Sequence, residues 1–499
     1  MKKLIAFAIA TAMASGAYAH GHDDHGYGRD VGEQYEQMIR AKSEELFGIA
    51  RPLDESSSMS LTQQQAEAHP AKLLTVAAGL RVRVVSAASN LAPDIDQMVL
   101  WPNDFAPTHI IACNEQGSSQ VGVQRIRLQD GGVENIISSG LSSCDPIRRT
   151  PWGTIVAGEE AGTKGRIIEI LDPVHTTNVA VPASGFGATS DPTHVVSRPA
   201  LGQFSFEGLG ILPNGVVYYT DENRPGSGGL GNPGGAVVKF IPSTLWNPSN
   251  PSIASLDQSP WAAGSIYGLR LGRNGNNTDV GQGNEYGRGV WVEITGTAPI
   301  NLRAAAKDLK LTSFYRPEDM SVDLKALKEG NVRVCGTNTG QDVPGLEGDN
   351  HWGEVYCLTD ESVEAASATA IDTGINIASI PEYQPLILGT GDFAMPDNID
   401  IQPGRGLFVM TEDGEGPIYS PPRNNDIWAC LDDGEDSDHL SDGCIKAATL
   451  NDLTAEPTGG FFDGTGRRYF ISIQHNITGH GVVLEVTGWQ PNRGWFGGW

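Results

Sequence analysis

Basic and aromatic residues are scarce in this chain of 499 residues. Only 34 Lys and Arg stand against 60 Asp and Glu, and the formal charge of −26 repels nucleic-acid phosphates and anionic membranes. Nucleic acid is therefore excluded as an expected partner. Charged residues make up only 19% of the chain, whereas Gly and Pro number 62 and 30, a composition that favours turns over long amphipathic helices. We expect an all-β fold.

Long apolar runs are missing after the first 19 residues, so no membrane-spanning segment is expected in the rest of the chain. Residues 1–19 themselves match a cleavable secretory signal, with Lys2-Lys3, an apolar run and Ala17-Tyr18-Ala19. This predicts a periplasmic or extracellular protein that begins at His20. Residues 20–74 are expected to form an N-terminal arm with a His-rich tail and a helix at 32–46. Residues 75–499 are expected to form one domain, and the oligomeric state stays open.

Cysteine is also rare, with six residues in the chain. In an oxidising compartment an even number permits disulfides. Cys335 and Cys357 lie on adjacent candidate strands, and Cys430 and Cys444 bracket an acidic loop. The remaining two, Cys113 and Cys144, either pair with each other or leave Cys144 available as a metal ligand.

One pattern recurs through the chain: an apolar strand of four to six residues that closes on Thr, Gly or Asn with an acid. The copies lie at 108–115, 153–160, 215–222, 331–338, 406–413 and 468–475. Several are followed by a second strand that begins with Gly, at 165–170, 235–240 and 353–357. Irregular repeats of short strands are typical of propeller blades, so we predict a six-bladed β-propeller. A two-sheet sandwich would not explain the repetition. The segments 241–310 and 423–447 are expected to be insertions.

Just before each repeated strand, the predicted innermost strand of the same blade begins with an unusual residue. The candidates are Cys144, Glu207, Glu318, Asp397-Asn398 and Glu456. Carboxylates a few ångströms apart raise one another's pKa and do not all stay ionised without cations. Oxygen ligands suit Ca²⁺, and a thiolate beside carboxylates suits a softer ion such as iron. The pattern predicts a shared metal site at one end of the channel.

An ordered set of short motifs resembles the PhoX family of alkaline phosphatases over about residues 100–485. The motifs are Thr150-Pro151-Trp152-Gly153-Thr154 with Glu159-Glu160, Phe206-Glu207, Tyr219-Thr220-Asp221, Arg316-Pro317-Glu318, Pro396-Asp397-Asn398, Glu456-Pro457-Thr458-Gly459 and Ile473-Gln474-His475. The resemblance implies a six-bladed propeller that hydrolyses phosphate esters with a Ca²⁺ and Fe³⁺ cofactor. It implies Cys144, Glu207 and Glu318 as iron ligands and Arg316 as the residue that holds phosphate. Around calcium it implies Glu159, Glu160, Asp221, Asp397, Asn398 and Glu456.

Three features depart from the family pattern. Asp145-Pro146-Ile147-Arg148-Arg149 follows Cys144 where the family has a small Gly-rich turn, and the acid doublet follows Gly158 instead of a cysteine. The signal carries Lys2-Lys3 instead of twin arginines. A second function class therefore stays open, in which the chain is a calcium-stabilised secreted propeller that serves as a binding or surface-structural module, with Cys113 bonded to Cys144 and no iron.

Overall fold

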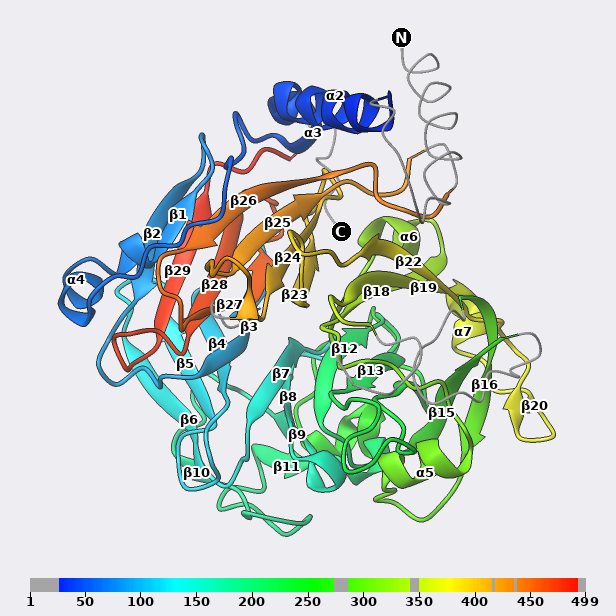
Figure 1. The fold of residues 1–499 in the computed structure, drawn as a ribbon. Coiled ribbons are helices and arrows are strands. Elements are labelled where there is room, and N and C mark those ends of the chain that lie inside the picture. The colour runs from blue at the N-terminus through cyan, green and yellow to red at the C-terminus, as the bar shows by residue number, and fades with distance from the viewer. Residues whose placement is uncertain (1–26, 273–285, 342–349, 415–417, 435–437, 492–499) are drawn as a thin grey trace.

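A computed structural model describes residues 27–272, 286–341, 350–414, 418–434 and 438–491. The signal segment and the His-rich tail lie outside these residues. The fold is all-β and propeller-like, with sheets arranged around a centre and helices at the edge (Figure 1). The helices are α2 (Tyr27–Ala41), α3 (Ser43–Phe47), α4 (Gln63–Ala68), α5 (Leu302–Asp308), α6 (Leu324–Lys328) and α7 (Val363–Ala366).

The strands between residues 95 and 197 form two sheets, each written here from its outer to its inner edge. The first is β10 (Val179–Ala180), β6 (Val133–Ser139), β5 (Val123–Arg127), β4 (His109–Asn114) and β3 (Ile95–Trp101). The second is β11 (Val195–Ser197), β9 (Ile167–Ile170), β8 (Ile155–Glu159) and β7 (Cys144–Arg149).

The middle of the chain forms one large sheet with two inner edges. Its order is β12 (Phe206–Ile211), β13 (Val217–Asp221), β14 (Val237–Pro242), β15 (Gly264–Leu271), β16 (Gly287–Ile294), β22 (Glu382–Leu388), β19 (Glu354–Ser362), β18 (Asn331–Asn338) and β17 (Pro317–Val322), and the hairpin β20 (Ile371–Asp372) and β21 (Ile375–Asn376) pairs with β16. The predicted insertion at 241–310 is corrected by this sheet, because β15 and β16 extend it instead of lying over one face.

The last two sheets each take one strand from the start of the domain. They run β1 (Leu74–Val76), β26 (Cys444–Leu450), β25 (Asp426–Cys430), β24 (Phe408–Glu412), β23 (Pro396–Ile401), and β2 (Arg81–Ser86), β29 (Val482–Thr487), β28 (Arg468–Gln474), β27 (Glu456–Phe462). The second insertion, predicted at 423–447, is corrected in part, because it contains β25 and the start of β26, which belong to this sheet. Pairing of β2 with β29 joins the two ends of the domain.

The inner strands meet in a closed ring. β3 lies against β7, β7 against β12, β12 against β17, β17 against β23, β23 against β27, and β27 again against β3. Close approach is possible where side chains are small: a Cβ on Gly208 of β12 would lie 2.5 Å from the backbone nitrogen of Met320 on β17. The repeated strands of the sequence are β4, β8, β13, β18, β24 and β28, the second strand of each group. Their Val- and Ile-rich runs are buried on both faces because neighbouring sheets pack against each side.

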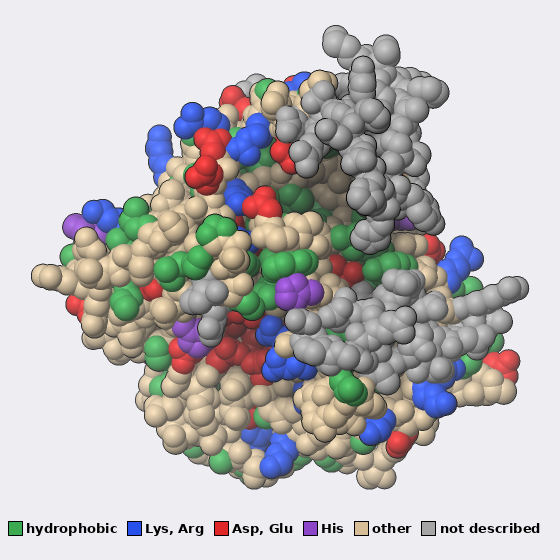
Figure 2. All heavy atoms as spheres, in the orientation of Figure 1, with side chains coloured by type: hydrophobic (Ala, Val, Ile, Leu, Met, Phe, Trp, Pro, Cys, Tyr) green, Lys and Arg blue, Asp and Glu red, His purple; other side chains and the backbone are tan. Residues whose placement is uncertain are grey.

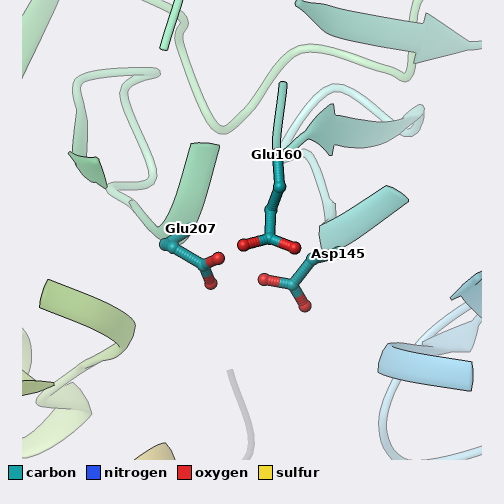
Figure 3. Close-up of side chains that lie close together, drawn as sticks. All are labelled: Asp145, Glu160 and Glu207. Atoms are coloured by element: carbon teal, nitrogen blue, oxygen red, sulfur yellow. The ribbon is translucent and has the colours of Figure 1, made fainter. Parts of the chain in front are cut away.

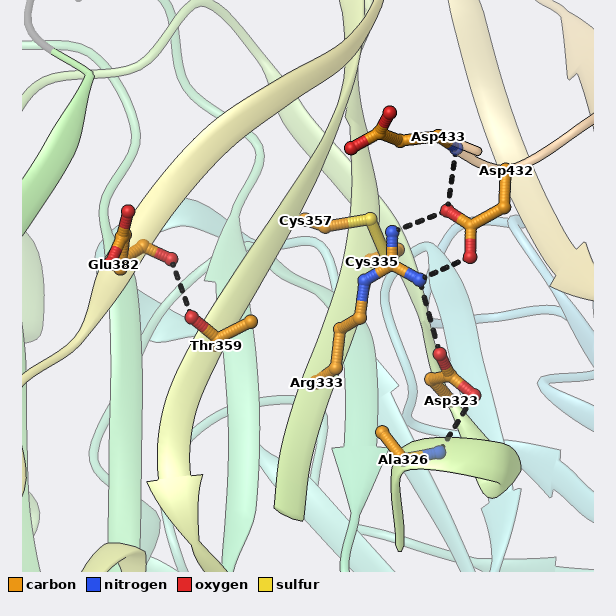
Figure 4. The surroundings of a disulfide bond; sticks show 9 residues. All are labelled: Asp323, Ala326, Arg333, Cys335, Cys357, Thr359, Glu382, Asp432 and Asp433. Carbon is orange, nitrogen blue, oxygen red and sulfur yellow. Dashed lines mark hydrogen bonds and ion pairs between the residues drawn. A yellow bond between two sulfur atoms is a disulfide. The ribbon is translucent and has the colours of Figure 1, made fainter. Parts of the chain in front are cut away.

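Three disulfides join strands, two of them within one sheet and one between neighbouring sheets. Cys335–Cys357 joins β18 to β19, Cys430–Cys444 joins β25 to β26, and Cys113–Cys144 joins β4 to β7 in the neighbouring sheet. Figure 4 shows the first of these beside Arg333, whose guanidinium pairs with Asp323 at 3.1 Å and with Asp432 at 2.7 Å. Arg333 thereby connects β18 to the loop after β25. Cys335 and Cys357 lie on adjacent strands as expected, and Cys430 and Cys444 pair across the acidic loop that they bracket.

Candidate metal centre

Five of the six inner strands carry an acid as their second residue. In each of them the pairing register shifts directly after the first residue, and such an irregularity re-aims the side chain that follows. All five acids are buried. They are Asp96 on β3, Asp145 on β7, Glu207 on β12, Glu318 on β17 and Asp397 on β23. Since the inner strands form a ring, the acids gather at one end of it.

Three carboxylates come close enough to share one cation. Asp145, Glu207 and Glu160, which follows β8, each place an oxygen within 4.8 Å of the others (Figure 3). Asp145 Oδ1 is buried without a hydrogen-bond partner among the described residues. Buried polar atoms normally have partners, and an unpartnered carboxylate oxygen in an all-oxygen group fits a hard cation such as Ca²⁺. The three residues therefore fit the calcium that the sequence predicts.

The electrostatics of the three carboxylates agree with a cation site. Burial raises the pKa of Asp145 to about 7. Burial, followed by the charges of Asp145 and Glu160, raises the pKa of Glu207 well above its usual range, and burial and Glu115 do the same for Glu160. A bound cation would reverse these shifts because it favours the ionised carboxylates.

A second set of side chains comes from the residue that directly follows each second strand. Four of these are acids, Glu115, Glu160, Glu222 and Asp413, and the other two are Thr339 and His475. We call the inner-strand acids and these four acids the acidic ring. Charges in the two sets raise the pKa of Glu318, Asp397 and Glu456 as well, in each case after burial as the main cause. Figure 2 shows acids gathered in a hollow of this face, with basic and histidine side chains beside them.

Arg316, the predicted phosphate-binding residue, lies in this ring. Its Nε is 2.9 Å from Glu222, and its Nη2 is 3.1 Å from Glu318 and 3.2 Å from Asp413. The backbone of Arg316 is in the left-handed region, with φ of 54°. A non-glycine residue in this region is strained and persists where its surroundings hold it, often at functional sites. The guanidinium is thus a fixed positive charge beside the carboxylates.

Cys144 is corrected from iron ligand to disulfide partner. It is bonded to Cys113, and the described residues contain no free cysteine. A half-cystine has no thiolate to give to a metal. In its place, the next residue, Asp145, occupies the inner-strand position that Glu207 and Glu318 hold in their own strands. The prediction was wrong by one residue along the strand. Cys144 is the first residue of β7, as Phe206 is of β12 and Pro317 of β17, whereas the acids are the second residues.

We expect Cys113→Ser and Cys144→Ser to have the same effect. Each removes a cross-link over 31 residues, so the free energy of unfolding should fall by roughly 4 kcal/mol in urea titrations. Calcium content should not change in either variant, and the double variant should be no less stable than the single ones. Loss of bound metal in Cys144→Ser alone would restore the ligand role.

Three other predicted ligands are engaged elsewhere. Both oxygens of Glu159 accept from buried Arg166, at 2.6 and 2.7 Å. Asp221 accepts from Arg303 Nε at 2.9 and 2.8 Å. The side-chain oxygen of Asn398 accepts from Thr458 Oγ1 at 2.6 Å and from the Gly459 backbone. We reassign these residues to the support of the site. Glu456 stays a candidate at the edge of the ring, beside Asp397.

Five acids of the ring were missed: Asp96, Asp145, Glu115, Glu222 and Asp413. The last three close repeated strands and were visible as part of an acid pair or Asn-acid pair in 114–115, 221–222 and 412–413. The alternation of side chains along a strand decides which member of a pair faces the ring. In each pair the residue that ends the strand supports the fold, and the residue directly after the strand faces the site.

The sequence model of the family described as alkaline phosphatase PhoX matches residues 147–476. The chain belongs to the PhoX family of alkaline phosphatases. That match begins within β7, after Asp145, and ends just after β28, so it includes the ring acids Glu160, Glu207, Glu318 and Asp397. No curated protein matches the sequence. No helix in the described part of the chain is long and apolar enough to span a membrane.

Solved structures resemble this member of the PhoX family only distantly. An aldose sugar dehydrogenase from Streptomyces coelicolor in its PQQ-bound form is 13% identical, with a TM-score of 0.44 over 83% of this chain and 99% of that chain. A virginiamycin B lyase from Staphylococcus aureus is 12% identical, with a TM-score of 0.38 over 83% of this chain and 99% of that chain. Neither likeness bears on the activity of the PhoX-family chain.

Proposed function

We propose that this chain is an exported, calcium-dependent phosphatase that hydrolyses phosphate esters at the acidic ring. One observation carries the proposal: in a PhoX-family chain, the carboxylates of Asp145, Glu160 and Glu207 converge within 4.8 Å, and a buried oxygen of Asp145 has no hydrogen-bond partner in the described part of the chain. Six inner strands in a closed ring support a count of six blades, with the third and fourth joined through β16 and β22. The signal-like residues 1–19 support export.

Calcium held by these carboxylates would neutralise phosphate charge and polarise the phosphoryl group. Arg316 supplies the other positive charge of the ring, and its planar fork of donors suits two phosphate oxygens. Glu222, Glu318 and Asp413 hold that fork in place before substrate binds. A substrate phosphate would then take over some of these hydrogen bonds. Iron is not part of the proposal, because the thiolate expected to select it is consumed in a disulfide.

The purified, oxidised protein tests this function directly. With Ca²⁺ we expect hydrolysis of p-nitrophenyl phosphate at neutral to alkaline pH, loss of activity in EGTA, and recovery when Ca²⁺ is restored. Elemental analysis should be run on the same samples. A protein with a full complement of calcium that hydrolyses neither phosphomonoesters nor phosphodiesters would instead be the non-catalytic module, a function class that the Cys113–Cys144 disulfide also allows.

We expect Arg316→Lys to lower kcat/KM for p-nitrophenyl phosphate by at least about tenfold, or 1.4 kcal/mol of transition-state stabilisation. Lysine keeps the charge but loses the bidentate geometry. Calcium content and melting temperature should stay near those of the wild type. Arg303→Lys is the matched control, since Arg303 forms its ion pair with Asp221 and donates to the backbone carbonyl of Glu222, not to the carboxylate of that ring acid. An unfolded Arg316→Lys protein would show that the residue is structural.

A further inference from the structure

His475 stands at the strand position where four other sheet segments carry an acid of the ring. It directly follows β28, as Glu115, Glu160, Glu222 and Asp413 follow the second strands of their own groups. The side chain is 53% exposed, so it borders solvent. The preceding residue, Gln474, donates from Nε2 to the ring acid Glu115 at 2.7 Å, and Asp94, which contacts His475, accepts from the Glu115 backbone, so the imidazole lies beside that part of the ring.

Asp94 orients the imidazole. The Nδ1 of His475 is 3.1 Å from Asp94 Oδ1, and this contact is the main cause of the raised pKa. Asp94 is itself held, because Gln116 Nε2 donates to its other oxygen and the Glu115 backbone N–H donates to its carbonyl at 2.8 Å. With Nδ1 committed to Asp94, Nε2 is the nitrogen available to a ligand. It has no partner among the described residues.

Arg316 and His475 thus lie beside different acids of the same ring. Arg316 contacts Asp413 at 3.2 Å, and the charge of Asp413 also helps to raise the pKa of His475, after the contact with Asp94 as the main cause. Arg316 is a permanent cation that cannot release a proton at physiological pH, whereas an imidazolium can. The two residues therefore suit different parts of one phosphate ester: the phosphoryl oxygens and the ester oxygen.

We propose that His475 is a catalytic residue that donates the proton from Nε2 to the leaving oxygen of the ester, with Asp94 as its positioning residue. This inference rests on the proposed phosphatase function. A water oxygen bonds to phosphorus, and the bond from phosphorus to the ester oxygen breaks with its electron pair on oxygen. That oxygen takes the proton from Nε2. A proton released by the attacking water restores the imidazolium, so the only products are the alcohol and inorganic phosphate.

The role predicts a dependence on the leaving group. An alkoxide is a poor leaving group and needs a proton in the transition state, whereas p-nitrophenolate leaves without one. His475→Gln should lower kcat/KM for ethyl phosphate by about 100-fold or more, within the range of general acid catalysis. For p-nitrophenyl phosphate the loss should be less than about fivefold. Asp94→Asn should show the same selectivity with a smaller loss, and the double variant should resemble His475→Gln.

His480→Gln is the matched control. This histidine lies in the same turn, and its Nδ1 contacts the carbonyl of Gly481 at 3.0 Å. It should leave both rates unchanged. Equal losses on the two substrates in His475→Gln, or no loss on either, would overturn the proton-donor role while leaving the phosphatase function in place. A wild-type protein that hydrolyses neither ester would overturn the proposed function and, with it, this inference.

Discussion

Glu207→Gln is expected to lower phosphatase activity by at least about 100-fold, a loss of roughly 2.7 kcal/mol in transition-state stabilisation. The substitution keeps the size of the side chain and one acceptor oxygen but removes its charge from the cluster with Asp145 and Glu160. Calcium affinity should fall in isothermal titration, because a carboxylate is a stronger ligand for a hard cation than an amide.

The stability of the calcium-free protein should rise in this variant, although its activity and its calcium affinity fall. In EGTA, Glu207→Gln should melt at a higher temperature than the wild type, because it relieves repulsion between buried acids. Glu159→Gln is the matched control: it breaks the buried pair with Arg166 and should lower the melting temperature with and without calcium, at unchanged calcium affinity. If Glu207→Gln bound calcium as tightly as the wild type, Glu207 would not be a ligand.

Removal of calcium should make the stability of the protein strongly dependent on pH. In the metal-free fold the pKa of Asp145 is raised from 3.8 to about 7 by burial. Between these values the folded state binds more protons than the unfolded state, so the free energy of unfolding falls as pH rises. The loss from Asp145 alone is on the order of 4 kcal/mol between pH 4 and pH 8.

Thermal melts at several pH values check this result. In EGTA the melting temperature should fall from pH 5 to pH 8, and Ca²⁺ should restore it most at the higher pH, because a ligand that binds only the folded state stabilises it. Asp145→Asn should make the pH dependence in EGTA less steep, and the part that comes from the other buried acids of the ring should remain. Identical melting curves with and without calcium, after verified removal of the metal, would mean that the ring holds no calcium.

The positions of the strands follow from the sequence alone. Runs such as Gly406-Leu407-Phe408-Val409-Met410 combine β-branched or large apolar side chains with a flanking glycine, and these local preferences hold wherever the run is packed. Glu207, Glu318 and Asp397 were predicted for the same reason, since each stands at the start of an apolar strand. The family resemblance depended on the same local motifs.

Only the tertiary structure decided which side chains point toward the ring. Side chains alternate along a strand, so an error of one residue exchanges the two faces, and this is why Cys144 was predicted in the place of Asp145. The register shift after the first residue of five inner strands sets that phase, and no local sequence signal marks it. The roles within the Glu159-Glu160 pair also depended on a partner, because only the position of Arg166 shows which carboxylate is neutralised.

The pairing of strands far apart in the chain could likewise not be predicted from the sequence. Leu74 lies opposite Leu450, and Arg81 lies opposite Thr487, so the start of the domain completes sheets formed by its end. The bond between Cys113 and Cys144 follows from the packing of β3 and β4 against β7. The sequence by itself determined where the strands lie and which residue types are available to a metal site. The closed ring decided which of them meet, because side chains far apart in the chain converge only when every inner strand has neighbours on both sides.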